Sequence, residues 1–237
     1  MQAHAAAVRP AGEVHFFFDP VCPFAWMTSK WLRLVAQQRD YDVTWRFISL
    51  RQLNAHLDYG TAFPPEYEAG HMAGLRLLRV AASVRNGHGD RAVGPLYLAY
   101  GTHIFEGPPG GDTATDAAAI ATASLTDAGL PAHHADALED SSWDAEIQAD
   151  TDHALSLAGK DLGTPILHVE PPDGTAFFGP VISRLPTPEQ AVELWDHVVG
   201  LARFAGFAEL KRSLREMPRL RALGATDDEA VSAAARG

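Results

Sequence analysis

The residue best suited to covalent chemistry is Cys22, the only cysteine in this sequence of 237 residues. It lies in the stretch FFFDPVCPFAW, residues 16–26, where an apolar run is followed by Cys-Pro-Phe. If a helix begins there, the unpaired N–H groups of its first turn and its positive dipole end favour a thiolate at its start. The thiolate is the reactive form of cysteine. We therefore expect Cys22 to be a nucleophile whose pKa is lower than that of a free cysteine.

A lone cysteine in an arbitrary sequence is more often a small buried hydrophobic residue than a nucleophile. The strand-to-helix position of Cys22 favours the nucleophile. Ala25 occupies the place where a dithiol redox motif has its second cysteine. Because no internal disulfide can form, any disulfide must join Cys22 to another molecule. The sequence predicts monothiol exchange, in which the thiolate attacks a mixed disulfide and a second small thiol releases the product.

The elements that position Cys22 follow from the hydrophobic pattern. Residues 14–18 are almost wholly apolar, which indicates a strand buried on both faces. Residues 23–38 carry one apolar stripe at helical spacing, and residues 41–50 begin with a period-2 alternation typical of a strand. This order predicts a right-handed βαβ unit with Cys22 at its first turn.

The pattern changes to helical spacing over residues 62–158, with helices expected near 113–127, 132–139 and 143–157. Two short apolar runs around Pro-Asp-Gly then predict a β-hairpin, and Thr187-Pro188-Glu189-Gln190 predicts the capping box of a last helix that ends near Phe204. The order predicts an α/β thioredoxin fold with a large all-helical insertion. We place the core at 13–61 and 159–215, the insertion at 62–158, and loose ends at 1–12 and 216–237.

A second signal is Thr164-Pro165, directly before a predicted strand. Only about 5–6 % of X-Pro bonds are cis in folded proteins, so the dipeptide alone would be read as trans. Combined with Cys-Pro on a βαβ unit, it is better interpreted as a cis-proline loop that faces the thiol across a cleft. The Thr164 backbone would then be free to pair with a bound thiol or peptide.

Composition excludes several classes of function. The net charge of −11, without a basic stripe, argues against nucleic acid. No apolar run is long enough to span a bilayer and no signal peptide is recognisable, so we expect a cytoplasmic protein without a membrane partner. His133 and His134 are expected to face apart, and without zinc-like ligand spacing we predict no metal.

Five blocks in order, FFFDPVCPFAWMTSKWL, ISLRQLN, LTDAGLP, GTPILHV and FFGPVIS, resemble the DsbA-like family of actinobacterial mycothiol-dependent reductases, which includes a nitroreductase. The resemblance implies a nucleophile at Cys22, a cis Pro165, a helical lid over the thiol and mycothiol as co-substrate. It also places Asn54 and Tyr67 near the cleft. Together with Pro23, Phe24 and Trp26 of the cysteine motif and Thr164 and Pro165 of the cis-proline loop, these are the residues that we expect to contact the thiol or the substrate. Phe24 is expected at the exposed rim.

Two alternatives stay open at this point. One is an enzyme similar to kappa-class glutathione transferases and 2-hydroxychromene-2-carboxylate isomerases, in which the protein activates a small thiol without forming a disulfide with it. The other is a non-catalytic thioredoxin-fold protein that only captures a ligand. The expected partners are a small thiol and a small-molecule or disulfide substrate, and a homodimer is possible.

Overall fold

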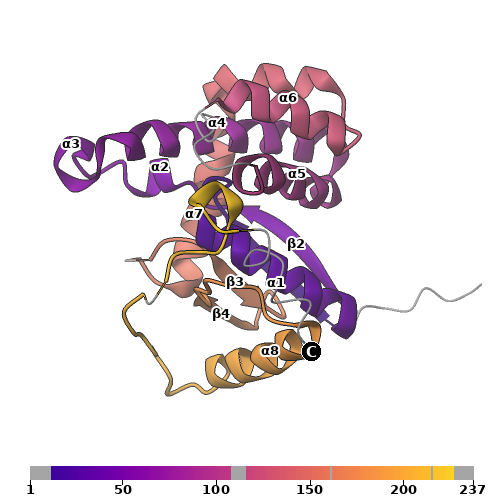
Figure 1. The fold of residues 1–237 in the computed structure, drawn as a ribbon, viewed down its shortest axis with the longest axis vertical. Coiled ribbons are helices and arrows are strands. Elements are labelled where there is room, and N and C mark those ends of the chain that lie inside the picture. Colours follow the sequence, from indigo (N-terminus) through magenta and orange to yellow (C-terminus); the bar gives the residue numbers. More distant parts are fainter. Residues whose placement is uncertain (1–11, 108–115, 161, 215, 227–237) are drawn as a thin grey trace, which may run out of the picture.

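The computed structural model describes residues 12–107, 116–160, 162–214 and 216–226. The expectations for residues 1–11 and 227–237 lie outside this range. A βαβ half and a ββα half of one core are separated by a long helical insertion (Figure 1). The core elements are β1 Gly12–Phe18, α1 Pro23–Arg39, β2 Tyr41–Phe47, β3 Ile166–Val169, β4 Thr175–Phe178 and α8 Pro188–Ala202.

The sheet has the strand order β2-β1-β3-β4, with β1 and β2 parallel and the other two neighbouring pairs antiparallel. Its central strand β1 is apolar because both of its faces are covered. Phe16 and Phe18 belong to a core cluster with α1 and α8 side chains, whereas Phe17 packs in a second cluster with Ala154 on the opposite face. All three phenylalanines are 0 % exposed, which confirms the buried strand predicted from the sequence.

The insertion leaves the core after β2 and returns before β3, and its first helix begins at Leu50, ahead of the residue 62 given in the sequence analysis. Figure 1 shows α4, α5 and α6 packed together above the sheet, at the end where β1 hands over to α1. Its elements are α2 Leu50–Leu53, α3 Tyr59–Ala62, α4 Pro65–His88, η1 Asp90–Ala92, α5 Val93–Phe105, α6 Ala117–Asp127, η3 Ala132–Glu139, η4 Ser141–Trp143 and α7 Asp144–Ala158.

The α/β thioredoxin fold with a helical insertion is confirmed, and the local differences have physical reasons. Residues 132–139 form a 3₁₀-helix, where an ordinary helix was expected. The segment follows Pro131, and with 8 residues it is longer than most 3₁₀-helices. Residues 113–115 of the expected 113–127 helix lie outside the described residues.

The loose end predicted from residue 216 onward is wrong for residues 216–226. Leu220 is 0 % exposed and belongs to the main core cluster. The backbone N–H of Arg219 donates to Ser183 O at 2.7 Å, and a short 3₁₀-helix, η5 Arg221–Leu223, follows. A single buried leucine in a polar, alanine-rich sequence has no periodicity that would reveal it.

Candidate thiol site

Cys22 is the N-cap residue of α1, as the sequence predicts. Its backbone is extended, with φ −82° and ψ 112°, and Pro23 fills the first helical position, where a missing N–H costs nothing. The Ala25 backbone N–H donates to Cys22 Sγ over 3.4 Å. The sulfur therefore occupies the place of a side-chain oxygen in an ordinary helix cap.

The cis-proline loop faces this sulfur. The Thr164-Pro165 bond is cis, which confirms the prediction, and Cys22 Sγ donates to Thr164 O at 3.5 Å. The Thr164 hydroxyl donates to Phe17 O at 3.1 Å, so the loop is tied to β1, the strand that carries the motif. Two segments 142 residues apart in the chain thus meet at the sulfur.

The ionisation of Cys22 differs from the sequence expectation. Burial raises the pKa of the thiol to about 12, the Ala25 and Phe24 N–H groups lower the pKa only in part, and the negative charge of Asp19 raises it. Cys22 is 7 % exposed, so the sulfur is not open to a cleft as predicted. The expected lowering is wrong for this closed arrangement, because helix N–H groups recover less than the thiolate loses by leaving water.

Trp26, in the first turn of the helix that Cys22 caps, is fixed against α5. The Trp26 indole N–H donates to Glu106 Oε1 at 2.8 Å, and its ring lies against Gly101, where a Cβ would come within 2.1 Å. The Phe105 ring stacks on Trp26 with centroids 6.4 Å apart. Trp26 is 1 % exposed, so the structure places it as a clamp between core and insertion and not on a surface that a substrate could reach.

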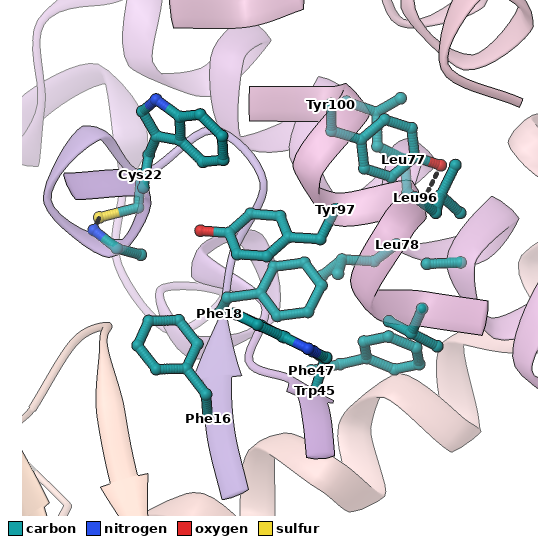
Figure 2. Close-up of a cluster of buried hydrophobic side chains, with 14 of the residues drawn as sticks. Phe16, Phe18, Cys22, Trp45, Phe47, Leu77, Leu78, Leu96, Tyr97 and Tyr100 are labelled. Atoms are coloured by element: carbon teal, nitrogen blue, oxygen red, sulfur yellow. Dashed lines mark hydrogen bonds between the residues drawn. The ribbon is translucent and has the colours of Figure 1, made fainter. Parts of the chain in front are cut away.

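Tyr97 of α5 is the inner wall of the site. Its ring stacks on Phe18 with centroids 3.8 Å apart, and its hydroxyl end points toward the helix end that carries Cys22 (Figure 2). Within the described residues the buried hydroxyl makes no hydrogen bond of good geometry, and the Ser29 side chain is the polar neighbour that lowers its pKa. Burial raises the Tyr97 pKa well above its usual value, and the Cys22 charge raises it further.

Asp19 holds the loop that leads into Cys22. Its carboxylate accepts the Val21 N–H at 3.0 Å and the Leu50 N–H at 2.8 Å, and its carbonyl accepts the Cys22 N–H at 3.1 Å. The side chain is 0 % exposed, and burial raises its pKa to about 7. Asp19 thus ties the nucleophile loop to the first helix of the insertion.

The structure brings the predicted site residues together unequally. Pro23 and Phe24 adjoin the sulfur, but Phe24 is half-buried and packs on the core, which differs from the exposed rim expected for it. The Asn54 side chain donates to Leu50 O at 2.9 Å and so closes its own short helix. Neither Asn54 nor Tyr67 makes a hydrogen bond to Cys22 within the described residues.

Tyr67 belongs to a group of aromatic rings. One member of the group, Tyr59, contacts Leu50, the residue whose N–H binds Asp19. The Tyr59 hydroxyl contacts Leu50 O at 3.5 Å and His71 Nδ1 at 3.1 Å. The Tyr67 ring stacks on Phe63 with centroids 5.8 Å apart and meets His71 edge-on at 5.6 Å. Tyr67 is 46 % exposed and is the outermost of these rings.

Sequence reasoning missed Tyr97, Asp19 and Glu106 as parts of the site. Tyr97 lies on an apolar helical stripe that was interpreted as core only. The only signal for Asp19 was an acidic residue at the end of a strand buried on both faces, where a carboxylate needs partners to be tolerated. Nothing local identifies Glu106, which acts by reaching Trp26 from the other subdomain.

Histidine placement also differs from expectation. The His133 and His134 rings have centroids 4.3 Å apart and do not face apart, and His134 Nε2 lies 3.0 Å from His88 Nε2. Neighbours along a 3₁₀-helix can lean together when a third ring packs beside them. No group of three or more potential ligands in the described residues is arranged to hold a metal ion. No described helix is long and apolar enough to cross a membrane.

Two solved structures share this architecture. A putative protein disulfide isomerase from Nitrosomonas europaea superposes with a TM-score of 0.52 at 16 % identity, covering 80 % of this chain and 98 % of that one. A probable DsbA oxidoreductase from Streptomyces coelicolor gives a TM-score of 0.50 at 16 % identity, covering 86 % and 95 %. At this identity the likeness shows the fold.

Sequence comparison is more specific. The uncharacterized protein Rv2286c of Mycobacterium tuberculosis is 34 % identical over 202 residues, which cover 84 % of this chain and 81 % of that protein. The model of the Rv2466c-like family, described as mycothiol-dependent nitroreductase Rv2466c, matches residues 21–212, from the residue before Cys22 to beyond α8. The chain therefore belongs to the Rv2466c-like family and is a thiol-dependent oxidoreductase of the thioredoxin fold.

Proposed function

We propose that the protein is a cytoplasmic monothiol oxidoreductase in which Cys22 is the nucleophile and mycothiol is the small-thiol co-substrate. The observation that carries this proposal is the setting of Sγ between the Ala25 N–H and the Thr164 carbonyl, next to the cis Pro165. The family description supports mycothiol as the thiol. Ala25 determines the monothiol character, because it supplies no second sulfur.

The exchange needs two displacements at sulfur. In the first, the Cys22 thiolate attacks a mixed disulfide, its sulfur–sulfur bond breaks, and the departing thiolate takes up the proton that Cys22 has lost. In the second, a mycothiol thiolate attacks the Cys22 mixed disulfide and forms oxidised mycothiol, and Cys22 regains its starting state. Electrons balance in each step, since one disulfide is broken for each one made.

A small electrophile can take the place of the disulfide. Reduction of a nitroaromatic to its nitroso form consumes two electrons and two protons and releases water. Two mycothiol molecules supply both when they are oxidised to one disulfide. In this version the nitro group takes up the two electrons and two protons as Cys22 and the first mycothiol join in a mixed disulfide, and the second mycothiol releases that disulfide as oxidised mycothiol and restores the Cys22 thiol. The ring group around Tyr67 is our candidate for contact with a planar substrate.

Each neighbour of Cys22 has a defined part in this scheme. The Ala25 N–H stabilises negative charge on Sγ, and the Thr164 carbonyl accepts the thiol proton in the resting state. The Tyr97 hydroxyl, which makes no hydrogen bond of good geometry within the described residues, would donate to the thiolate or to a bound thiol. Residues 62–158 act as the lid, because α5 supplies both Tyr97 and the clamp on Trp26.

The proposal requires the lid to move. At 7 % exposure Cys22 does not meet a disulfide, and burial raises its pKa to about 12, so the closed form holds a neutral thiol. Admitting water removes the desolvation that raises the pKa, while the Ala25 N–H remains in place. Opening of the lid would therefore expose Cys22 to a disulfide and lower the pKa of its thiol at the same time.

Intact-mass analysis tests the proposal. The protein is incubated separately with oxidised mycothiol, oxidised glutathione and oxidised coenzyme A, and the mass gain per chain is measured. We expect one mycothiol per chain, removed by further mycothiol and absent in Cys22→Ser. Capture of glutathione or coenzyme A at an equal rate would overturn the choice of mycothiol, and no capture of any thiol would overturn the exchange chemistry.

The missing second sulfur provides an independent test. Position 25 follows Cys22 by one helical turn, and its backbone N–H already contacts Sγ. We expect Ala25→Cys to form an internal disulfide on oxidation and to accumulate less mixed disulfide than the wild type, with Ala25→Ser as the control of similar size. An Ala25→Cys protein that keeps two free thiols under oxidised mycothiol would show that the two positions do not form a redox pair.

Burial of Cys22 favours one rival, a protein that captures a ligand without turnover. The oxidoreductase and the capturing protein differ in whether added mycothiol releases the mixed disulfide at Cys22. A capturing protein would form the mixed disulfide and hold it when mycothiol is added, whereas the oxidoreductase returns to the free thiol over repeated cycles. Product mass followed over several equivalents of disulfide substrate distinguishes them.

A further inference from the structure

Two histidines from distant parts of the insertion meet at the C-terminal end of α4. His88 is the last residue of that helix, and His134 lies in η3, 46 residues further along the chain. Their Nε2 atoms are 3.0 Å apart, and their ring centroids are 5.1 Å apart. Tyr67, in the first turn of α4, lies about 30 Å away along the helix axis. The histidine pair is therefore separate from the ring group around Tyr67.

The His134 ring is fixed in its orientation by α4. The Ser83 hydroxyl lies 2.8 Å from His134 Nδ1. Gly87 leaves room for the ring, because a Cβ at this position would lie 3.1 Å from His134 Cε1, the carbon between the two ring nitrogens. His134 is 4 % exposed, whereas His88 is exposed. A buried imidazole is thus held with Nδ1 on a hydroxyl group and with Nε2 facing a second imidazole that solvent reaches.

This arrangement has the features of a histidine that binds a metal ion. Such a histidine uses one ring nitrogen for the metal, and a hydrogen bond from the other nitrogen fixes its tautomer. When the Nδ1–H of His134 donates to Ser83 Oγ, Nε2 presents a lone pair. On a tetrahedral ion with metal–nitrogen bonds of about 2.0–2.1 Å, two imidazole nitrogens lie about 3.3 Å apart. The observed separation of the two Nε2 atoms, 3.0 Å, is close to this value.

We propose that His88 and His134 bind one divalent transition-metal ion through their Nε2 atoms, with water in the remaining positions and with Ser83 as the positioning residue. Imidazole donors favour Zn²⁺, Cu²⁺ and Ni²⁺, whereas Mg²⁺ and Ca²⁺ prefer oxygen ligands. The described residues contain no group of three or more potential ligands arranged for a metal, and this site needs only two from the protein. The proposal does not depend on the thiol chemistry.

The sequence alone predicted no metal because the two ligands are far apart in the chain. His133 and His134 were the histidines considered there, and His88 becomes a neighbour of His134 only when η3 packs on α4. The expectation was therefore based on ligand spacing along the sequence. The fold supplies a spacing that the sequence does not show.

The simpler alternative is a hydrogen bond between two neutral imidazoles. Burial lowers the pKa of His134, and the neighbouring His133 and His88 lower it further, so that its ring is neutral near pH 7. A neutral imidazole is also the form that binds a metal ion. His88 is exposed, which gives an ion a path from solvent to the nitrogen of the buried ring. The two alternatives therefore differ in whether the pair takes up zinc.

A bound ion would join α4 to η3. The Arg79 guanidinium already donates to Leu138 O at 3.1 Å, and a second link at the end of α4 would hold η3 at another point. An ion that binds the folded chain and not the unfolded chain stabilises the fold by mass action. Zinc should therefore raise the midpoint of thermal unfolding, by an amount that increases with its concentration.

Isothermal titration calorimetry with zinc chloride near neutral pH tests the site. We expect one zinc per chain in the wild type and in Cys22→Ser, which removes the thiolate as another ligand. In His88→Ala and in His134→Ala the dissociation constant should rise by about tenfold or more, since even the loss of an outer hydrogen bond has an effect of this size. Zinc should raise the thermal midpoint of the wild type and leave that of both histidine variants unchanged.

The role of Ser83 has its own test. Ser83→Ala should weaken zinc binding, whereas Ser83→Thr, which keeps the hydroxyl, should bind zinc as the wild type does. A merely structural role would change the thermal midpoint of the zinc-free protein without changing its affinity for zinc. Equal zinc affinity in Ser83→Ala and the wild type would overturn the assignment of Ser83 as the positioning residue.

Matched controls remove exposed histidines elsewhere. His56→Ala and His197→Ala lie outside the pair and should bind zinc with the affinity of the wild type. His88→Ala changes an exposed residue, so it keeps the test valid if the buried substitution His134→Ala fails to fold. A wild type that binds no zinc would overturn the proposal. So would zinc binding that persists unchanged in His88→Ala, or binding that is lost in Cys22→Ser.

Discussion

The starts of α1 and α8 use the same local device for different purposes. Each helix begins with an N-cap side chain that accepts the N–H of the third helical residue, at 3.4 Å for Cys22 Sγ and 3.3 Å for Thr187 Oγ1, and each has proline next. The α8 cap is closed reciprocally, because Gln190 Oε1 accepts the Thr187 N–H at 3.2 Å. The α1 cap has Ala25 at that position and receives no return contact.

The difference shows what separates a structural cap from a reactive one. In α8 the first turn also carries Glu189, so a side-chain carboxylate already complements the helix dipole. The first turn of α1 has no acidic residue, and its N–H groups face a polarisable sulfur that also meets the Thr164 carbonyl. The hydrogen bonds of the α8 cap stabilise the helix. The N–H groups at the start of α1 can in addition stabilise a negative charge that forms on Cys22 Sγ during the reaction.

The largest expected effect comes from Cys22→Ser. Serine is a good N-cap residue, so the free energy of unfolding should change by less than about 1 kcal/mol. Disulfide exchange should fall by on the order of 10³-fold or more, because the nucleophile is gone. Mixed-disulfide formation and urea unfolding are measured on the same preparation.

The converse variant is Thr187→Cys in the Cys22→Ser background. It places a thiol at the α8 cap, which is more exposed and lacks the Thr164 carbonyl. Iodoacetamide should alkylate this thiol faster at neutral pH than it alkylates Cys22, yet without selective capture of mycothiol. Equal capture at both caps would mean that any N-cap thiol suffices.

A smaller effect is expected where α5 covers α1. In Gly101→Ala the new Cβ would meet the Trp26 ring at 2.1 Å, so the clamp must shift, at a cost of about 1–3 kcal/mol in unfolding free energy. Alkylation of Cys22 should become faster, because its cover is displaced. Gly200→Ala on α8 has no heavy atom within 4 Å and should raise stability by about 0.4–1 kcal/mol. Faster alkylation in Gly200→Ala as well would remove the link between the clamp and access.

Thr187→Ala should have a purely structural effect. Loss of the cap removes one hydrogen bond to the Gln190 N–H, which lowers the unfolding free energy by about 1 kcal/mol. The rate of mixed-disulfide formation at Cys22 should stay unchanged. A change in that rate would show that the two caps are coupled through the contact between α1 and α8.

A separate effect concerns the pH dependence of stability. The folded pKa of Cys22 is about 12, above the roughly 8.5 of an unfolded cysteine. Between these values the unfolded chain loses the thiol proton and the folded chain keeps it, so stability falls as pH rises above about 8.5 and is unaffected below. Compared with Cys22→Ser, the wild type should therefore lose stability from pH 8.5 to 10. Parallel stability curves for both proteins would contradict the raised pKa.

Much of this architecture could be predicted because it depends on hydrophobic and helix-capping patterns within short stretches of sequence. The phenylalanine run of β1, the capping box of α8 and the Cys-Pro start of α1 each follow from residues close together in sequence. The cis Pro165 was predictable only in combination with the Cys-Pro motif. The insertion was predicted from the helical spacing over residues 62–158, and the family resemblance added its role as a lid over the thiol.

The parts that could not be predicted depend on packing between distant segments. The direction of the Cys22 pKa shift depends on burial in the folded protein, and the Tyr97 hydroxyl shows its orientation only in the folded site. Leu220 lies in an unpatterned tail, yet it completes the core. A helix end predicts the groups around a thiol but not the amount of water that reaches it.

The contact between Asp19 and Gly74 restricts how this family can vary. A Cβ at position 74 would lie 2.6 Å from Asp19 Oδ1 and 2.9 Å from Val21 Cγ2, so no side chain fits there while the carboxylate holds the Leu50 N–H. Relatives that keep the aspartate must keep glycine on α4, and a relative with alanine there must have a smaller residue at position 19. The two positions, 55 residues apart, should change together across an alignment, and their covariation would record the docking of the insertion onto the loop of the nucleophile.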